Sequence, residues 1–319
     1  MTVTLALAGD TMLGRGVAEA LAERPPQSLV APEVAEIAQA ADLSVLNLEC
    51  CISDGGSPWP ASGKPFFFRA PPAAVETLRH LGISCVTLAN NHALDFGEEA
   101  LADTLAHLES AGIAVVGAGP DVERARRPAV LEADGMRLAV LGLTDHPADF
   151  AAGPDRPGVA FADLRSGLPT WVGEVVAGTE ADAVLASPHW GPNMTTEPVP
   201  HVRRAADDLV GAGVTLIAGH SAHVFHGVAG RVMFDLGDFL DDYAIDPTLR
   251  NDLGILWLVR LDQRGPVSVE AVPLRLDYCF TRLADGDDEA WIRSRLRRAC
   301  QAMGADVTEA NGRLRVALR

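Results

Sequence analysis

The sequence predicts an α/β fold in which buried strands alternate with helices that cover a sheet. Short, almost wholly apolar runs recur along the chain, as in strands that are buried on both faces. Amphipathic stretches lie between many of these runs and end at a glycine, as helices commonly do. With 319 residues, of which 48% are hydrophobic, the chain is long enough to bury a sizeable core. This alternation indicates a sheet with helices packed outside it.

The expected strands are rich in Val, Ile and Leu, and most of them end at a cluster of polar residues. The first, at residues 3–8, runs directly into Gly9 and Asp10. Near-continuous apolar runs of this length suit strands that have no face in water. Further strands are expected at 43–46, 83–88, 137–143, 183–186, 214–218, 232–234, 255–261 and 267–276.

The expected helices carry start or stop signals. Pro32 stands at the first turn of one helix, where its missing N–H is not needed. Gly82, Gly112 and Gly211 follow three others, and glycine ends helices because it readily adopts a left-handed conformation. The helices are expected at 31–41, 72–81, 98–111, 202–210 and 289–303.

Two stretches rich in proline and glycine interrupt this alternation. The first, 54–72, surrounds three consecutive phenylalanines, so we expect an ordered excursion over the sheet rather than a linker. The second, 145–169, is expected to be a long loop. Neither contains a repeat that would indicate a further domain.

Composition and charge exclude several classes of protein. The formal net charge of −17 disfavours nucleic acid and anionic membranes as partners. No apolar run approaches the ~18 residues of a membrane-spanning helix, so we expect no membrane span and a cytoplasmic protein. The five cysteines include no CxxC pair, which argues against a disulfide scaffold. A small anionic substrate would need a locally positive site to approach so acidic a chain.

Side chains that bind metals or transfer protons stand at the carboxyl ends of the predicted strands. Ligands of open α/β sheets bind at these ends, so we expect the side chains to meet at one edge. Carboxylate, amide and imidazole groups together favour Mn, Fe, Zn or Mg over a metal that prefers thiolates. Hydrolysis uses such a set because bound ions acidify a water molecule and hold the oxygens of the scissile group. We predict a divalent metal site, with one or two ions, from Asp10, Glu49, Asn91, His189, His220 and His223.

These polar clusters belong to longer sequence blocks that follow one another in order. The blocks are Gly9-Asp10-Thr11-Met12-Leu13-Gly14-Arg15, Asn47-Leu48-Glu49, the run from Ala89 to Gly97, His189-Trp190-Gly191 and Gly219-His220-Ser221-Ala222-His223-Val224. Together they resemble the CapA family of capsule-synthesis proteins, within the calcineurin-like metallophosphoesterase superfamily. The run from Asp235 to Tyr243 is similar to the family's Leu-Gly-Asn/Asp-Phe signature, and the resemblance covers roughly residues 3–245.

The resemblance implies a metallophosphoesterase-like four-layer α/β/β/α sandwich with a dinuclear-type metal site at the carboxyl ends of its strands. Residues 1–245 would form this CapA-like domain. Residues 246–319 would add strands that complete the sandwich and a C-terminal helix.

The resemblance also implies a role for each ligand. Asp10 would be the first metal ligand, and Glu49 would stand where the superfamily has a bridging aspartate. Asn91 would be the amide ligand. His189 and His223 would complete the site.

Three positions differ from the superfamily pattern. Its Asp-x-His opening would place a histidine at position 12, where this chain has Met12. Its Gly-x-His-x-His pattern would place another near position 221, where Ser221 stands and His220 is one residue away. The third difference is Glu49, whose side chain is one methylene longer than aspartate. These differences affect the ligands of the second ion, so one ion and two ions both stay open.

The same blocks supply candidate catalytic and substrate-binding residues. His92 would be the unligated acid that protonates the leaving group, and Asp95 either orients this imidazole or belongs to a turn. Arg15 follows the first metal loop, where the family motif implies a catalytic and substrate-binding role towards an anion. Lys64 and Arg69 either bind the same anion or belong to a solvated loop. Three acids after the strand at 232–234 either support the metal ligands or form an exposed loop: Asp238, Asp241 and Asp242.

The implied function is that of a soluble, metal-dependent hydrolase of the CapA type with a small anionic substrate. The bond is a phosphoester or, given the family's link to poly-γ-glutamate, a γ-glutamyl-type amide. The alternative is a non-catalytic subunit that supports poly-γ-glutamate or capsule polymer synthesis. Other chemistries lack their motifs, since the chain has no Gly-x-Ser-x-Gly elbow, no P-loop and no Gly-x-Gly-x-x-Gly fingerprint after its first strand.

Overall fold

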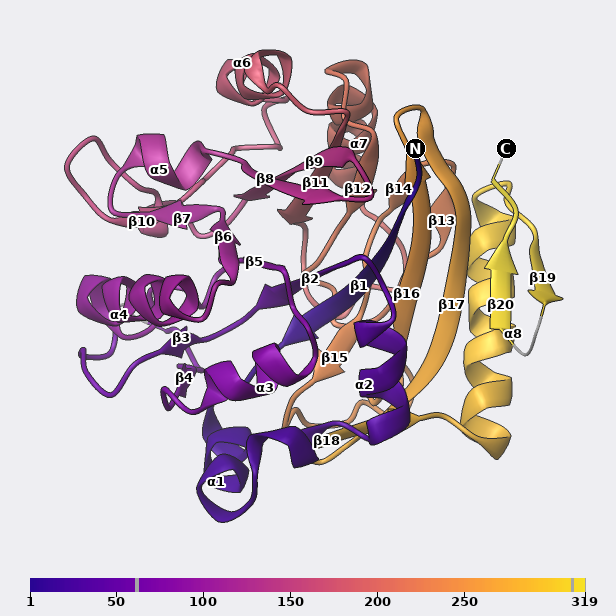
Figure 1. The fold of residues 1–319 in the computed structure, drawn as a ribbon, viewed down its shortest axis with the longest axis horizontal. Coiled ribbons are helices and arrows are strands. Elements are labelled where there is room, and N and C mark those ends of the chain that lie inside the picture. Colours follow the sequence, from indigo (N-terminus) through magenta and orange to yellow (C-terminus); the bar gives the residue numbers. More distant parts are fainter. Residues whose placement is uncertain (61–62, 311–312, 319) are drawn as a thin grey trace.

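The computed structural model describes residues 1–60, 63–310 and 313–318, which form two large β-sheets with helices outside them (Figure 1). The first sheet is mixed: its N-terminal strands are parallel to one another, and the strands from the last third of the chain are antiparallel. In spatial order it contains β19 (Val307–Ala310), β20 (Arg313–Val316), β17 (Gly265–Asp277), β16 (Leu253–Asp262), β1 (Val3–Thr11), β2 (Leu43–Leu48), β5 (Cys85–Thr87) and β6 (Ala114–Val116). Two short strands join this path, where β15 (Asp238–Leu240) pairs with β1 and β18 (Phe280–Leu283) pairs with β17.

The second sheet is smaller and comes from the middle of the chain. In spatial order it contains β13 (Val228–Ala229), β14 (Val232–Met233), β12 (Leu216–Ala218), β11 (Ala183–His189), β9 (Met136–Thr144) and β8 (Ala129–Ala133). Its central strands β9, β11, β12 and β14 are parallel. Two short pairs lie outside both sheets: β3 (Cys51–Ile52) with β4 (Arg69–Ala70), and β7 (Ala118–Gly119) with β10 (Gly158–Val159).

The helices lie against the outer faces of the sheets and at one edge. They are α1 (Arg15–Glu23), α2 (Pro32–Gln39), α3 (Ala74–His80), α4 (Gly97–Ser110), α5 (Val122–Arg126), α6 (Thr170–Gly178), α7 (Pro200–Gly211) and α8 (Gly286–Ala302), with 3₁₀ turns η1 (Pro26–Leu29) and η2 (Ala148–Phe150). Among the helices of the described residues, none is both long and apolar enough to cross a membrane.

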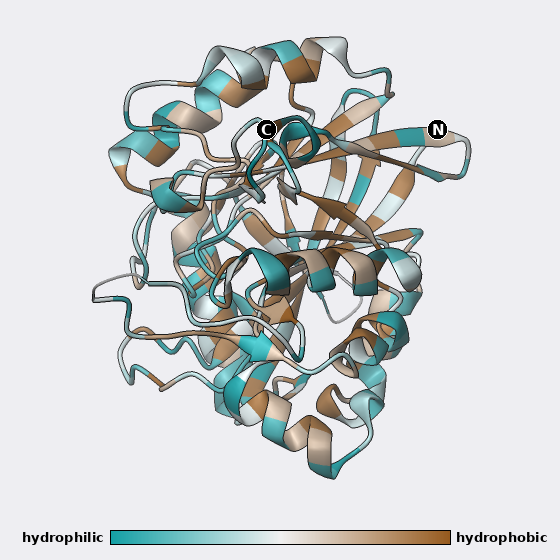
Figure 2. Cartoon of the chain, turned by 90° about the vertical axis from the view of Figure 1, so that its left-hand side faces the viewer, coloured by the Kyte–Doolittle hydropathy of each residue, from teal (hydrophilic) through white to brown (hydrophobic). Residues whose placement is uncertain are grey.

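Alternating side chains divide the apolar core into layers. Leu5 and Leu7 of β1 pack between the two sheets, together with Leu185 of β11. Ala6 and Ala8 belong to the opposite face, which packs against α1, α2, α3 and α4. A third apolar layer lies between the second sheet and helices α6 and α7. The predicted metallophosphoesterase-like four-layer sandwich is therefore confirmed, and Figure 2 shows its largely hydrophobic strands between helices of mixed character.

The last part of the chain extends the same sandwich. Strand β16 pairs antiparallel with β1, so the first sheet continues beyond residue 245 without a break. Helix α8 contributes Ile292, Leu296 and Cys300 to the layer between the sheets and covers their edge beside β17 (Figure 1). The boundary between 1–245 and 246–319 stays a prediction.

Every strand and helix expected from the sequence is present, and the differences are additional elements. Helix α1 begins at the last residue of the first sequence block, and α6 begins in the stretch that follows the long loop. Neither Gly14 nor Pro169, which precede these helices, supplies a side-chain cap. A helix without a capping side chain lacks the most informative start signal in a sequence, which is why both escaped prediction.

Candidate metal centre

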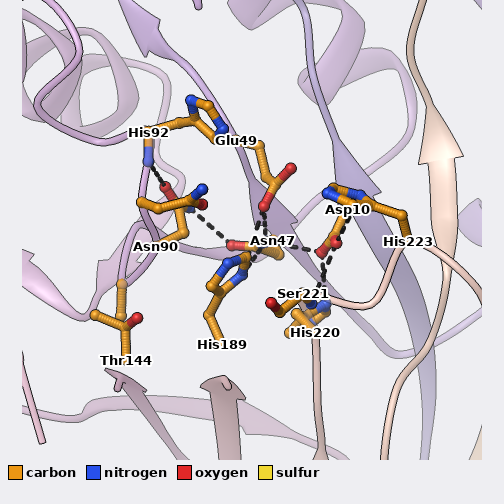
Figure 3. A network of polar contacts seen from close by, with 12 residues as sticks. Asp10, Asn47, Glu49, Asn90, His92, Thr144, His189, His220, Ser221 and His223 are labelled. Carbon is orange, nitrogen blue, oxygen red and sulfur yellow. Dashed lines mark hydrogen bonds and ion pairs between the residues drawn. The ribbon is translucent and has the colours of Figure 1, made fainter. Parts of the chain in front are cut away.

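The carboxyl ends of both sheets meet at one edge, where five of the six predicted metal ligands come together (Figure 3): Asp10, Glu49, His189, His220 and His223. In the first sheet, Asp10 lies in β1 and is paired with Asn47 of β2, two residues before Glu49. In the second sheet, His189 is the last residue of β11 and forms an isolated bridge with His220. Parallel strands that end at the same edge thus place these side chains together, as the strand-end pattern predicts.

Gly9 is required for the close approach of β1 to the segment around residue 237. A Cβ atom at Gly9 would lie 1.7 Å from the carbonyl oxygen of Gly237, a distance that no side chain can tolerate. The backbone N–H of Asp10 donates to the same oxygen at 2.9 Å. The glycine therefore allows the acidic segment that contains Asp235 and Asp238 to lie beside Asp10.

Two groups of potential ligand atoms share Asp10. In the first group, ligand atoms of Asp10, Glu49 and His189 all lie within 4.8 Å of one another. In the second, Asp10 is joined by His223 and Asp238 within the same distance. All five side chains are buried, and their carboxylate and imidazole groups are the donors that Mn, Fe and Zn accept.

Asn47 fixes the first group from its centre, as Figure 3 shows. Its Nδ2 donates to Asp10 Oδ1 at 2.8 Å and to Glu49 Oε1 at 3.3 Å. Asn90 holds Asn47 in turn, because its Nδ2 donates to Asn47 Oδ1 at 2.9 Å. The Nε2 of His189 is buried and has no hydrogen-bond partner in the described part of the chain, so it is available to a ligand.

Asn91 also presents an unpaired oxygen. Its Oδ1 is buried and has no hydrogen-bond partner among the described residues, while its backbone carbonyl accepts from Lys64 Nζ at 2.7 Å. A buried amide oxygen without a partner costs free energy unless something satisfies it. A cation would satisfy it.

His220 and Ser221 contact Asp10 directly. His220 Nδ1 lies 3.1 Å from Asp10 Oδ1, and its Nε2 is 3.1 Å from Ser187 Oγ. The backbone N–H of Ser221 donates to Asp10 Oδ2 at 3.3 Å, and Ser221 has a φ of 111°. His220 belongs to neither of the two ligand groups found among the described residues. Its predicted role as a ligand stays a prediction.

His92 and Asp95 form a pair next to these groups. His92 Nδ1 lies 2.7 Å from Asp95 Oδ2, which also accepts the backbone N–H of Phe68 at 2.7 Å. The Phe68 ring stacks on the imidazole, with 4.0 Å between ring centroids. Burial lowers the pKa of His92, although the hydrogen bond with Asp95 opposes this shift. The ring is thereby fixed on one face by Phe68 and at one nitrogen by Asp95.

The three predicted substrate-binding cations are all engaged within the protein. Lys64, the only lysine of the sequence, pairs through Nζ with Asp95 Oδ1 at 2.9 Å. Arg15 forms an ion pair with Asp242 and lies over the ring of Phe68. The guanidinium of Arg69 donates to the carbonyl oxygen of Gly55 and lies over the Phe96 ring. Contact between these residues and a substrate stays a prediction.

When no cation is bound, burial and mutual repulsion disfavour the ionised forms of the clustered acids. Burial and the charge of Asp10 raise the pKa of Glu49 well above its usual value. Burial and the charge of Asp241 do the same to the pKa of Asp238. Burial also opposes ionisation of Asp10, but the neighbouring His220 holds its pKa below the usual value. A bound divalent cation would offset this repulsion, so the donor set and its unpaired atoms fit a metal.

Two stacked sheets between helix layers, with carboxylate, amide and imidazole groups at one edge, define a sandwich of the metallophosphoesterase type with a candidate metal centre. The chain belongs to the bacterial capsule synthesis protein PGA_cap family, whose model matches residues 4–243.

Relatives carry names from polymer synthesis. The chain is 30% identical to a probable polyglutamine synthesis accessory protein of Mycobacterium tuberculosis, over 96% of this chain and 93% of that protein. It is 30% identical to the PGA biosynthesis protein CapA of Bacillus subtilis, over 73% of this chain and 62% of that protein. A hypothetical protein of Thermus thermophilus aligns with a TM-score of 0.49 and 16% identity, over 87% of this chain and all of that one (100%). At that level the structural likeness does not inform function.

Sequence reasoning missed polar residues that complete this edge. Asn47 lies in β2, directly after the predicted strand at 43–46, and its place at the start of the Asn47-Leu48-Glu49 block was the available signal. Asp145 and His146 follow β9, their Oδ1 and Nδ1 atoms are 2.5 Å apart, and the His146 ring lies 5.2 Å from the His189 ring. The strand-end rule that identified the other ligands applies to this pair as well.

His226, three residues after His223, is buried and makes the free energy of unfolding depend on pH. Burial lowers its pKa from 6.5 to about 4, and its Nε2 donates to the carbonyl oxygen of Thr195 at 2.8 Å. As pH falls from about 6.5 to about 4, the unfolded chain binds a proton that the folded chain does not, so the free energy of unfolding falls. The expected loss from this group is ~3 kcal/mol.

The variant His226→Gln keeps a donor for Thr195 but does not titrate. Its free energy of unfolding, measured with urea as a function of pH, should fall less than that of the wild type by ~3 kcal/mol over this range. The half-buried His107 on α4 provides the control substitution His107→Gln. If His226→Gln and His107→Gln give the same pH dependence, burial of His226 is not the cause.

Proposed function

We propose that this protein is a metal-dependent hydrolase that acts on a small anionic substrate, either a phosphoester or a γ-glutamyl-type amide. The single observation that supports this most strongly is the group formed by Asp10, Glu49 and His189 within 4.8 Å. Glu49, His189 and the unpaired oxygen of Asn91 would hold a divalent ion together with Asp10. When bound, such an ion polarises the scissile group and acidifies a water molecule.

His92 is placed to donate a proton to the leaving group. Asp95 occupies Nδ1 of its imidazole, which leaves Nε2 as the nitrogen that can face a substrate. Lys64 and the N–H of Phe68 hold Asp95, so the imidazole, its carboxylate and the lysine form one connected set. A fixed imidazole of this kind is the usual form of a general acid.

An anionic substrate would approach the site past Arg15. The guanidinium of Arg15 lies over three aromatic rings, those of Phe66, Phe68 and Tyr243. It is also paired with Asp242, and these contacts restrict the movement of the arginine. Because Asp242 already balances the charge of Arg15, the substrate would be small and would depend mainly on the metal for charge neutralisation.

The second candidate function is a non-catalytic role in the synthesis of poly-γ-glutamate or capsule polymer. The names of the relatives favour it, since one is called an accessory protein and another a biosynthesis protein. The replacement of a histidine by Met12 in the first block also favours it, because Met12 is buried and its sulfur accepts the N–H of Gly14. In this role the same site would bind its ligand without cleaving it.

The two functions are separated by assaying a panel of phosphoesters and γ-glutamyl amides. The protein is stripped with EDTA and tested with and without added Mn²⁺. We expect hydrolysis of at least one class with Mn²⁺ and none without it, and the double variant His189→Ala, His223→Ala should retain no metal. Inactivity across the whole panel by a metal-loaded protein would favour the non-catalytic role. Stoichiometric metal in the double variant would contradict the assigned site.

A further inference from the structure

The second ligand group joins Asp10 and His223 to Asp238, which is not among the ligands that the family pattern assigns. We propose that it is a second cation site in which Asp238 is a metal ligand and Asp10 is shared between the two ions. The inference rests on the proposed metal-dependent function, because it adds an ion to the same centre. It also answers a question that the sequence left open, namely whether one ion or two ions bind.

The position of Asp238 follows from strand pairing. Asp238 begins β15, which runs parallel to β1, and it is the direct partner of Asp10 in this pairing. The two carboxylates therefore lie side by side at the carboxyl edge of the first sheet. The Met12 side chain belongs instead to the apolar layer beneath the helices and is fully buried there. Asp238 of β15 thus takes the place of the histidine that the superfamily pattern would have at position 12.

His223 lies beside both carboxylates. Its Nδ1 is hydrogen-bonded to Asp238 Oδ1 at 2.8 Å and lies 3.5 Å from Asp10 Oδ2. A carboxylate that only orients a metal-binding imidazole makes a hydrogen bond of this kind as well. The feature of Asp238 that points to a ligand is therefore its other oxygen.

The second oxygen of Asp238 is unsatisfied. Asp238 is 1% exposed, and its Oδ2 has no hydrogen-bond partner within the residues that the structure describes. Its neighbours Asp10 and Asp241 are acidic, and the buried Oδ2 of Asp241 is unpaired as well in the same part of the chain. By contrast, Asp235 accepts the backbone N–H groups of Ala222 and Gly237. Asp238 thus keeps a buried oxygen that a cation would satisfy, whereas both oxygens of Asp235 already have partners.

The test counts Mn²⁺ ions in protein that has been stripped with EDTA, loaded with MnCl₂ and freed of excess metal. We expect two ions per chain in the wild type and one in Asp238→Asn. Asparagine keeps the size of the side chain and an oxygen that accepts from His223, so an orienting role would leave both ions in place. His189→Ala should also reduce the count to one. Asp242→Asn alters a nearby carboxylate outside both ligand groups and should retain two.

A spectroscopic measurement on the wild type does not depend on any variant. Two Mn²⁺ ions that share a carboxylate are magnetically coupled, so we expect the electron paramagnetic resonance spectrum of a coupled pair. Two ions retained by Asp238→Asn, or an uncoupled single-ion spectrum in the wild type, would overturn the second site. One ion per chain that depends on His189 but not on Asp238 would leave the proposed function intact. Absence of any Mn²⁺ in the wild type would overturn both proposals.

Discussion

Asp10→Asn should abolish both metal binding and hydrolysis. Asp10 belongs to both ligand groups, and its two oxygens contact Asn47, His220, Ser221 and His223. Metal ions contribute several kcal/mol to a hydrolytic transition state. Each ~1.4 kcal/mol changes the rate tenfold, so turnover should fall by ~10³-fold or more.

Metal content and turnover of Asp10→Asn are measured on the same preparation. Asp207→Asn on the exposed side of α7 makes the same chemical change outside both ligand groups and should match the wild type in both. If Asp10→Asn binds metal and keeps more than a tenth of wild-type turnover, Asp10 is not a ligand that both groups require.

His92→Asn should lower turnover by ~10²-fold or more and leave the metal content unchanged. The asparagine amide can still donate to Asp95 where Nδ1 of the imidazole did, so the local structure should persist. What is lost is the second ring nitrogen, which we propose as the proton donor to the leaving group. The size of the effect is that of a missing general acid, which is smaller than the loss of the metal itself.

The measurement for His92→Asn is kcat on the best substrate of the panel, together with the Mn²⁺ count. His107→Asn on the outer helix α4 serves as the control. A substrate with an activated leaving group needs little protonation, so the variant should lose less activity towards it. Equal losses for activated and unactivated substrates would show that another residue is the acid. His146, whose ring lies 5.2 Å from the His189 ring, is one candidate.

The sequence by itself determined the order of the elements and the position of most of the site. Apolar runs such as 183–186 indicate buried strands because burial on both faces leaves no room for polar side chains. The residues that follow such runs then lie at one edge, since the parallel strands of each sheet share a direction. Asp10, Glu49 and His189 could therefore be placed together from local patterns alone.

Only the tertiary structure decided which charges are already paired. Lys64 and Arg15 are cations near a predicted anion site, yet Lys64 is paired with Asp95 and Arg15 with Asp242. No local pattern predicts these pairs, because each joins segments that the fold brings together from distant parts of the chain. The energy of such a charge depends on its burial and on the charges around it. The spacing of residues along the sequence does not give this information.

The place of Asp238 was decided in the same way. Its sequence context allows an exposed acidic loop or a contact with the metal ligands. The pairing of β15 with β1, permitted by the missing side chain of Gly9, places Asp238 next to Asp10 and thus among the metal ligands rather than in an exposed loop. Strand pairing between distant segments depends on the packing of the whole sheet, whereas the end of a single strand depends on a few neighbouring residues. The sequence therefore determined the edge at which the chemistry lies, and the fold decided which acids share it.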